Sequence, residues 1–165
     1  MGAGYHGGFG KTHGSGIKVS YKLGPKGEGY KNYTREDLVN YIDGVTEEST
    51  AIAKGIRNGT IKVNVLGDRL FEEYLGASPD TVAMAIGNQI YLRNSSINIY
   101  SDMVHEGTHA MDYIHGIKES VTSSWVGETR AYSAERKFQI AKDGHIDFAN
   151  ENDMMVHIWK NYKRR

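Results

Sequence analysis

The sequence predicts an α+β domain in which a small twisted sheet packs on helices. Three observations predict it. Helical segments that begin at Thr34 and Thr46 precede two short stretches with the alternation of strands, which a Gly-Asn turn joins. A longer helical segment follows, centred on residues 101–116, and two more helices complete the chain. With 165 residues, of which 39% are hydrophobic, the chain suits a single folded domain with its own core.

The first thirty residues differ from the rest in composition. Residues 2–29 hold 10 of the 20 glycines, and only Ile17–Tyr21 has the pattern of a short strand. The free energy gained by burying so few apolar side chains does not offset the conformational entropy that the segment would lose on folding. We expect a Gly-rich flexible leader over residues 1–30 and a folded domain over residues 31–165.

Capping and turn residues divide the folded part into elements. Thr34 and Thr46 are typical N-caps, and Asn58-Gly59 and Gly76 are typical stops. The expected elements are helices from Thr34, over 46–57, 68–75, 101–116 and 153–160, a helix after Gly127, and strands over 61–65, 82–86 and 89–93. Gly87-Asn88 predicts a hairpin between the last two strands, and we expect the 89–93 strand at an edge of the sheet.

The helix over residues 101–116 is expected to have Ser101 as its N-cap and to stop at Gly116. Gly107 in its interior costs about 1 kcal/mol relative to Ala. We expect this helix to pass close to another backbone there.

The same helix carries His105-Glu106-Gly107-Thr108-His109, the pattern H-E-x-x-H. Residues four apart share one face of a helix, so both imidazoles reach a single metal ion. Glu106 is not needed as a ligand and is placed to take a proton from water. The sequence therefore predicts a metal site on this helix.

A catalytic site of this kind needs a third protein ligand. Glu128 begins the helix after Gly127, with small Ala131 one turn later, and a loop from His109 allows this helix to return against the first. Glu135, two turns on and near the same face, is either the rival ligand or a hydrogen-bond partner of a histidine.

H-E-x-x-H followed by E-x-x-A on a second helix resembles the gluzincin branch of the zincin metallopeptidases. The sequence is similar to that of bacterial toxin peptidases from His105 to Gly116 and from Gly127 to Phe138. Examples of these peptidases are the anthrax lethal factor catalytic domain and the Pro-Pro endopeptidases. The resemblance implies a zincin-like fold, zinc held by His105, His109 and Glu128, and Glu106 as general base. Aminopeptidases of this branch have Asn where this chain has Gly127, so an endopeptidase is expected.

The resemblance also implies a group that stabilises the oxyanion, which gluzincins supply as a Tyr or His. Tyr132, one turn after Glu128, either faces the site in this role or packs between the helices, and the other candidates are Tyr100, His145 and His157. By the same likeness the chain is expected to be a secreted or delivered effector that cleaves a protein or peptide and has a cognate inhibitor.

Two alternatives remain. A metzincin uses H-E-x-x-H-x-x-G-x-x-H, and His115 occupies the last position, although Asp112 stands where the pattern has Gly. The third ligand would then be His115. A non-catalytic binding module with a zincin-like helix is the other alternative.

The net charge and composition of the chain limit the kinds of partner and metal ligand that are expected. The formal net charge is zero, so the chain lacks the excess positive charge that is typical of nucleic-acid-binding proteins. The chain has no apolar run of the ~18 residues that a membrane span needs, and no signal peptide is visible in it. Cysteine is absent, which excludes thiolate ligands for a metal. We therefore expect neither a nucleic-acid nor a membrane partner.

Overall fold

The computed structural model describes residues 31–117, 124–142 and 144–162. The leader predicted for residues 1–30 lies outside these residues. The described part is an α+β structure of six helices and one mixed three-stranded sheet, as expected. Its elements are α2 (Arg35–Ile42), α3 (Glu47–Arg57), β1 (Lys62–Leu66), α4 (Asp68–Leu75), β2 (Ala83–Ile86), β3 (Gln89–Arg93), α5 (Ile99–Ile114), α7 (Ser124–Lys142) and α8 (Glu151–Tyr162).

The first two helices begin at the threonines that the sequence indicated. The Thr34 hydroxyl accepts a hydrogen bond from the Asp37 amide, which caps α2. Thr46 and Ser49 form a reciprocal capping box at the start of α3. These caps satisfy amides that have no partner inside the helix, so the predicted starts are confirmed.

The sheet has the strand order β1-β3-β2. β2 and β3 form the predicted antiparallel hairpin, and β1 pairs with β3 in parallel. The expectation that residues 89–93 form an edge strand is wrong, because β3 hydrogen-bonds to a neighbour on each side. Within the described residues, the two edges of this sheet are β1 and β2.

The central helix α5 starts earlier than expected. Asn98 precedes its first turn, and the Asp102 amide already donates to the Asn98 carbonyl. The expectation that Ser101 is the N-cap is wrong, because its hydroxyl donates to the Asn98 carbonyl from inside the helix at 3.1 Å. The helix ends at Ile114, before Gly116 in a left-handed conformation (φ 64°), as predicted.

Gly107 does mark a close approach, but to a side chain. A Cβ built at Gly107 lies 2.7–2.9 Å from three side-chain atoms of Ile52 on α3. Any side chain at this position would overlap the buried Ile52 side chain, so Ile52 or the helix would have to move to admit it.

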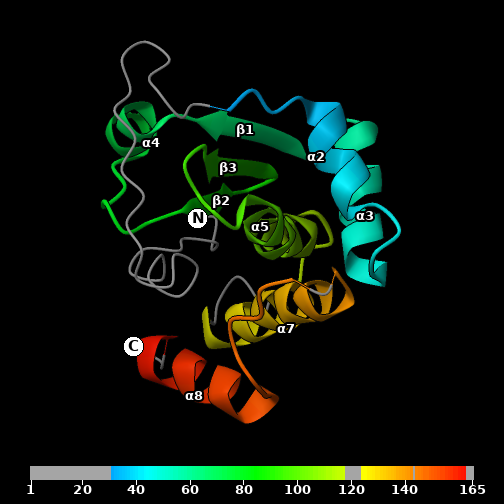
Figure 1. Ribbon diagram of the computed structural model, residues 1–165, viewed down its shortest axis with the longest axis vertical. Helices are drawn as coiled ribbons and strands as arrows, with labels where there is room; N and C mark the ends of the chain where they lie inside the picture. The colour runs from blue at the N-terminus through cyan, green and yellow to red at the C-terminus, as the bar shows by residue number, and fades with distance from the viewer. Residues whose placement is uncertain (1–30, 118–123, 143, 163–165) are drawn as a thin grey trace.

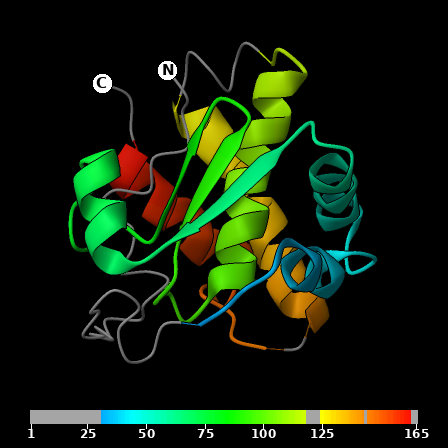
Figure 2. The same cartoon turned by 90° about the horizontal axis from the view of Figure 1, so that it is seen from above.

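The elements are stacked along the long axis of the molecule (Figure 1). α5 lies beneath the sheet and contacts both β2 and β3, α7 packs against α5, and α8 packs against α7. α2 and α3 flank α5 on one side, which the view from above also shows (Figure 2). α5 is thus enclosed by sheet and helices, and all but a few of its residues are buried.

The last two helices are longer than the sequence suggested. α7 begins at Ser124, so Gly127 lies within its first turn, and α8 extends beyond 153–160 at both ends. No helix among the described residues has the length and apolar character that a membrane crossing requires.

Candidate metal centre

α5 presents the two motif histidines from successive turns. His105 is completely buried and His109 is 5% exposed. Their ring centroids are 5.1 Å apart. The helical period places both rings on the face that α7 covers, so the backbone fixes the separation of the two imidazoles.

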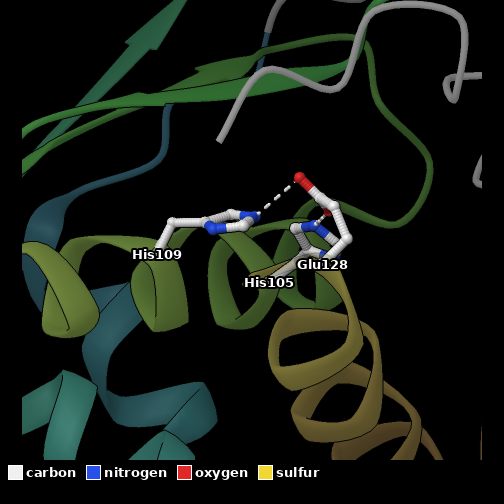
Figure 3. Close-up of side chains that lie close together, drawn as sticks. All are labelled: His105, His109 and Glu128. Atoms are coloured by element: carbon white, nitrogen blue, oxygen red, sulfur yellow. Dashed lines mark hydrogen bonds and ion pairs between the residues drawn. The ribbon is translucent and has the colours of Figure 1, made fainter. Parts of the chain in front are cut away.

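α7 brings Glu128 between these rings (Figure 3). Its Oε1 lies 3.0 Å from His105 Nε2, and its Oε2 lies 3.1 Å from His109 Nε2. One donor atom from each of the three residues lies within 4.8 Å of the others, and all three residues are buried. The structure therefore brings together the three residues that the sequence selected as ligands.

The spacing suits a metal ion. Two ligand atoms about 2.1 Å from a tetrahedral zinc ion are roughly 3.4 Å apart. The Glu128 oxygens lie 3.0 and 3.1 Å from the two imidazole nitrogens, and one donor atom from each residue lies within 4.8 Å of the others, so rotations of these side chains would bring the three donors to that value. Two imidazoles and one carboxylate are also a donor set that zinc accepts, with a fourth position left for water or substrate.

The local charge also favours a cation. Besides Glu128, the residues Asp102, Glu106 and Glu135 are also buried, and each is at most 1% exposed. Burying several carboxylates together is unfavourable unless they are protonated or compensated by positive charge. A divalent cation between His105, His109 and Glu128 supplies that compensation.

Glu106 directly follows His105 in the sequence and is fully buried. Burial raises the pKa of its carboxyl well above the ordinary value, and the neighbouring Glu128, Asp102 and Glu135 raise it further. Such a carboxyl has an increased affinity for a proton, which is the property that a general base in this position requires.

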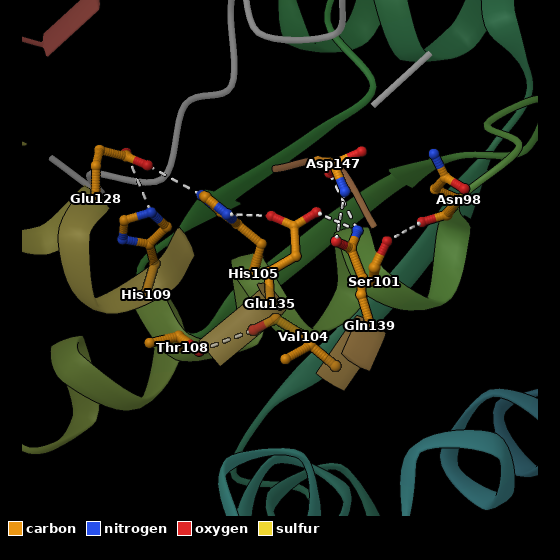
Figure 4. Close-up of polar contacts among 10 residues, drawn as sticks. All are labelled: Asn98, Ser101, Val104, His105, Thr108, His109, Glu128, Glu135, Gln139 and Asp147. Carbon is orange, nitrogen blue, oxygen red and sulfur yellow. Dashed lines mark hydrogen bonds and ion pairs between the residues drawn. The ribbon is translucent and has the colours of Figure 1, made fainter. Parts of the chain in front are cut away.

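Glu135 contacts the other side of His105. Its Oε1 lies 2.9 Å from His105 Nδ1, whereas Glu128 approaches Nε2 (Figure 4). A carboxylate that accepts a hydrogen bond from Nδ1–H leaves the Nε2 lone pair available to a metal. Of the two roles that the sequence left open for Glu135, this geometry matches the partner of a histidine.

Tyr132 is buried against the same histidine. Its ring meets the His105 ring edge-on, with centroids 4.5 Å apart, and it also packs in a cluster with Met154, Ile158 and Tyr162 of α8. Burial raises the pKa of its phenol well above the ordinary value, and Glu128 and Glu135 contribute. The phenol is therefore a neutral hydrogen-bond donor, and its catalytic role stays a prediction.

The other candidates are placed elsewhere. His115 is the exposed C-cap of α5 and is not one of the three clustered residues, so the structure does not bring the metzincin-type ligand to the site. Tyr100 stacks on Tyr41. His145 pairs with Asp147, and the His157 ring packs against Tyr132.

Sequence reasoning missed Gln139 and Asp147, which connect to Glu135. Gln139 follows Glu135 by one helical turn, and that spacing was the available signal. Asp147 lies in an irregular segment between α7 and α8, where no periodic pattern indicates which residues meet.

Comparisons of this chain with models of protein families, with curated proteins and with solved structures give no match. The resemblance to zincins therefore rests on the motif residues of the sequence.

Proposed function

We propose that this protein is a zinc-dependent endopeptidase with its metal centre at His105, His109 and Glu128. One observation supports the proposal: side chains from two separate helices bring two imidazoles and a carboxylate, the donor types that zinc accepts, within 4.8 Å of one another. Glu106, on the same helix as the two histidines, is buried and has a raised pKa.

Zinc, when bound, acts as a Lewis acid that polarises the scissile carbonyl and lowers the pKa of water towards about 7. Side chains of the protein carry out the proton transfers and stabilise the developing negative charge. Glu106 accepts the proton of the attacking water and passes it to the leaving amine. Tyr132 is the proposed donor to the oxygen that gains negative charge, since its phenol stays protonated.

β2 is the proposed binding site for the substrate. It is an edge of the described sheet and packs against α5. An edge strand offers unpaired backbone groups to an extended peptide, which adds as a further strand. A peptide bound along Ala83–Ile86 would lie beside the helix that carries Glu106.

The test combines metal analysis with a digest. We expect about one zinc ion per chain in the purified wild type, loss of zinc on chelation, and cleavage of a peptide library. Glu106→Gln should retain zinc and cleave nothing. Glu73→Gln changes an exposed glutamate on α4 and should behave as wild type.

Two results would overturn the proposal. A chain that binds no zinc and keeps its full thermal stability in chelator is the non-catalytic binding module instead. Hydrolysis that persists in Glu106→Gln would mean that another group serves as the base.

The resemblance to toxin peptidases leads us to propose further that the protein is a secreted or delivered effector with a cognate inhibitor. Expression of the wild type in a target cell should then be toxic, and expression of Glu106→Gln should not. Equal toxicity of the two would contradict this role.

A further inference from the structure

Glu135 belongs to a chain of hydrogen bonds that extends from His105 to the segment after α7 (Figure 4). Its Oε1 faces His105 Nδ1, and its Oε2 lies 3.5 Å from Gln139 Nε2. Gln139 Nε2 lies 3.1 Å from Oδ2 of Asp147. The metal centre is thereby connected to a residue 42 positions beyond His105 in the sequence.

The orientation of the Gln139 amide is fixed by the backbone. The amide N–H of Asp147 donates to Gln139 Oε1 at 3.0 Å. Because a main-chain N–H only donates, the amide oxygen must face it, and the NH₂ group must face the two carboxyls. Gln139 is 4% exposed, and the Asp147 side chain is 2% exposed.

Burying these polar groups together costs free energy. The buried carboxyl groups of Glu135 and Asp147 both contact the NH₂ group of Gln139. Two carboxylates that lie close together in the protein interior repel each other when both are charged. Replacing buried charged groups by apolar side chains of similar volume is often neutral or stabilising. What the polar arrangement provides is a defined direction for Glu135.

We propose that Gln139 and Asp147 are positioning residues of the metal centre. They hold Glu135 in line with His105 Nδ1, so that the imidazole keeps its proton on Nδ1 and directs Nε2 towards the metal. This inference rests on the proposed zinc site, and it adds that the Gln139 amide and the Asp147 carboxyl help to set the affinity of that site.

The test variant is Gln139→Met, which keeps the side-chain length and removes the amide. Zinc affinity, measured by competition with a chromophoric chelator, should fall by about tenfold, as for partners behind a metal ligand. The visible spectrum of the cobalt-loaded protein should change. In nitrogen NMR of the zinc-loaded protein, the Nδ1 proton of His105 should exchange faster with water.

Two controls separate positioning from general support. Arg136, on the same helix, donates to the carbonyls of Phe148 and Ala149 in the same segment at 3.1 Å each. Arg136→Met should therefore destabilise the segment and leave zinc affinity within about twofold of wild type. Lys137→Met, which removes an exposed ion pair between α7 and Glu48 on α3, should also leave it unchanged.

The outcomes are distinguishable. A wild type that binds no zinc overturns the proposed function and this inference together. A wild type that binds zinc, with Gln139→Met equal to it in affinity and cobalt spectrum, overturns the inference alone, as does an equal loss in Arg136→Met. If Gln139→Met does not fold, Asp147→Ala is read by the same criteria.

Discussion

The guanidinium of Arg130 on α7 binds the carboxylate of Asp112 on α5 in a bidentate ion pair. Arg130 Nε lies 2.9 Å from Oδ2, and Nη2 lies 2.7 Å from Oδ1. Asp112 is 2% exposed. Since Asp112 follows His109 by three residues and Arg130 follows Glu128 by two, the pair joins α5 and α7 beside the candidate metal centre.

Arg130→Met should lower the free energy of unfolding by about 2 kcal/mol, because the buried Asp112 carboxylate loses its guanidinium partner. Urea denaturation measures this change. Arg69→Met is the matched control, since Arg69 and Glu73 form an exposed pair whose loss costs about 0.5 kcal/mol or less. Equal losses in the two variants would show that the Asp112–Arg130 pair contributes nothing beyond an ordinary surface pair.

Gly107→Ala should destabilise the fold, although alanine is the better helix residue by about 1 kcal/mol. The added methyl overlaps the Ile52 side chain, and such overpacking costs about 1–3 kcal/mol. Thermal and urea unfolding should show the loss, and Ile52→Ala in the same chain should remove the overlap. Gly144→Ala, where nothing lies within 4 Å, serves as the control. A Gly107→Ala protein more stable than wild type would refute the close approach.

Features of the fold that depend on neighbouring residues could be predicted from the sequence. Thr34, Thr46 and Gly116 mark helix ends through hydrogen bonds and φ values within a few residues. The place of β3 in the sheet could not be predicted in this way. It depends on the parallel pairing with β1, whose partner residues are 27 positions apart, and no local pattern specifies that choice.

In the candidate site, too, the features that depend on local spacing could be predicted, and those that depend on packing could not. The helical period is enough to bring His105 and His109 together, and the start of a second helix indicates Glu128. Which side of His105 each glutamate approaches depends on how α7 packs on α5, so the roles of Glu128 and Glu135 were left open by sequence alone.

The two glutamates should differ in their effect on zinc. Glu128→Ala removes a ligand and should weaken zinc binding by more than about 100-fold, whereas Glu135→Ala removes a partner of His105 and should cost about 10–100-fold. Chelator competition measures both. The reverse order would assign the ligand role to Glu135 and would require α7 to bind in a different register against α5.

Stability should decrease at alkaline pH through the buried phenols of α7 and α8. Tyr162 is 5% exposed, and its burial, with Tyr132 beside it, raises its pKa well above the ordinary value. In the unfolded chain a phenol loses its proton near pH 10. Above that pH the unfolded state binds fewer protons than the folded state, so the free energy of unfolding falls as pH rises towards the folded-state pKa.

Tyr162→Phe isolates this contribution. Urea denaturation at about pH 9, 10 and 11 should show a shallower decline than in wild type, by up to about 1.4 kcal/mol per pH unit. Tyr113→Phe alters a phenol that is 57% exposed and should leave the decline as steep as in wild type. The same slope in wild type and Tyr162→Phe would mean that the Tyr162 phenol reaches water in the folded protein, which is incompatible with the packing of α8 on α7.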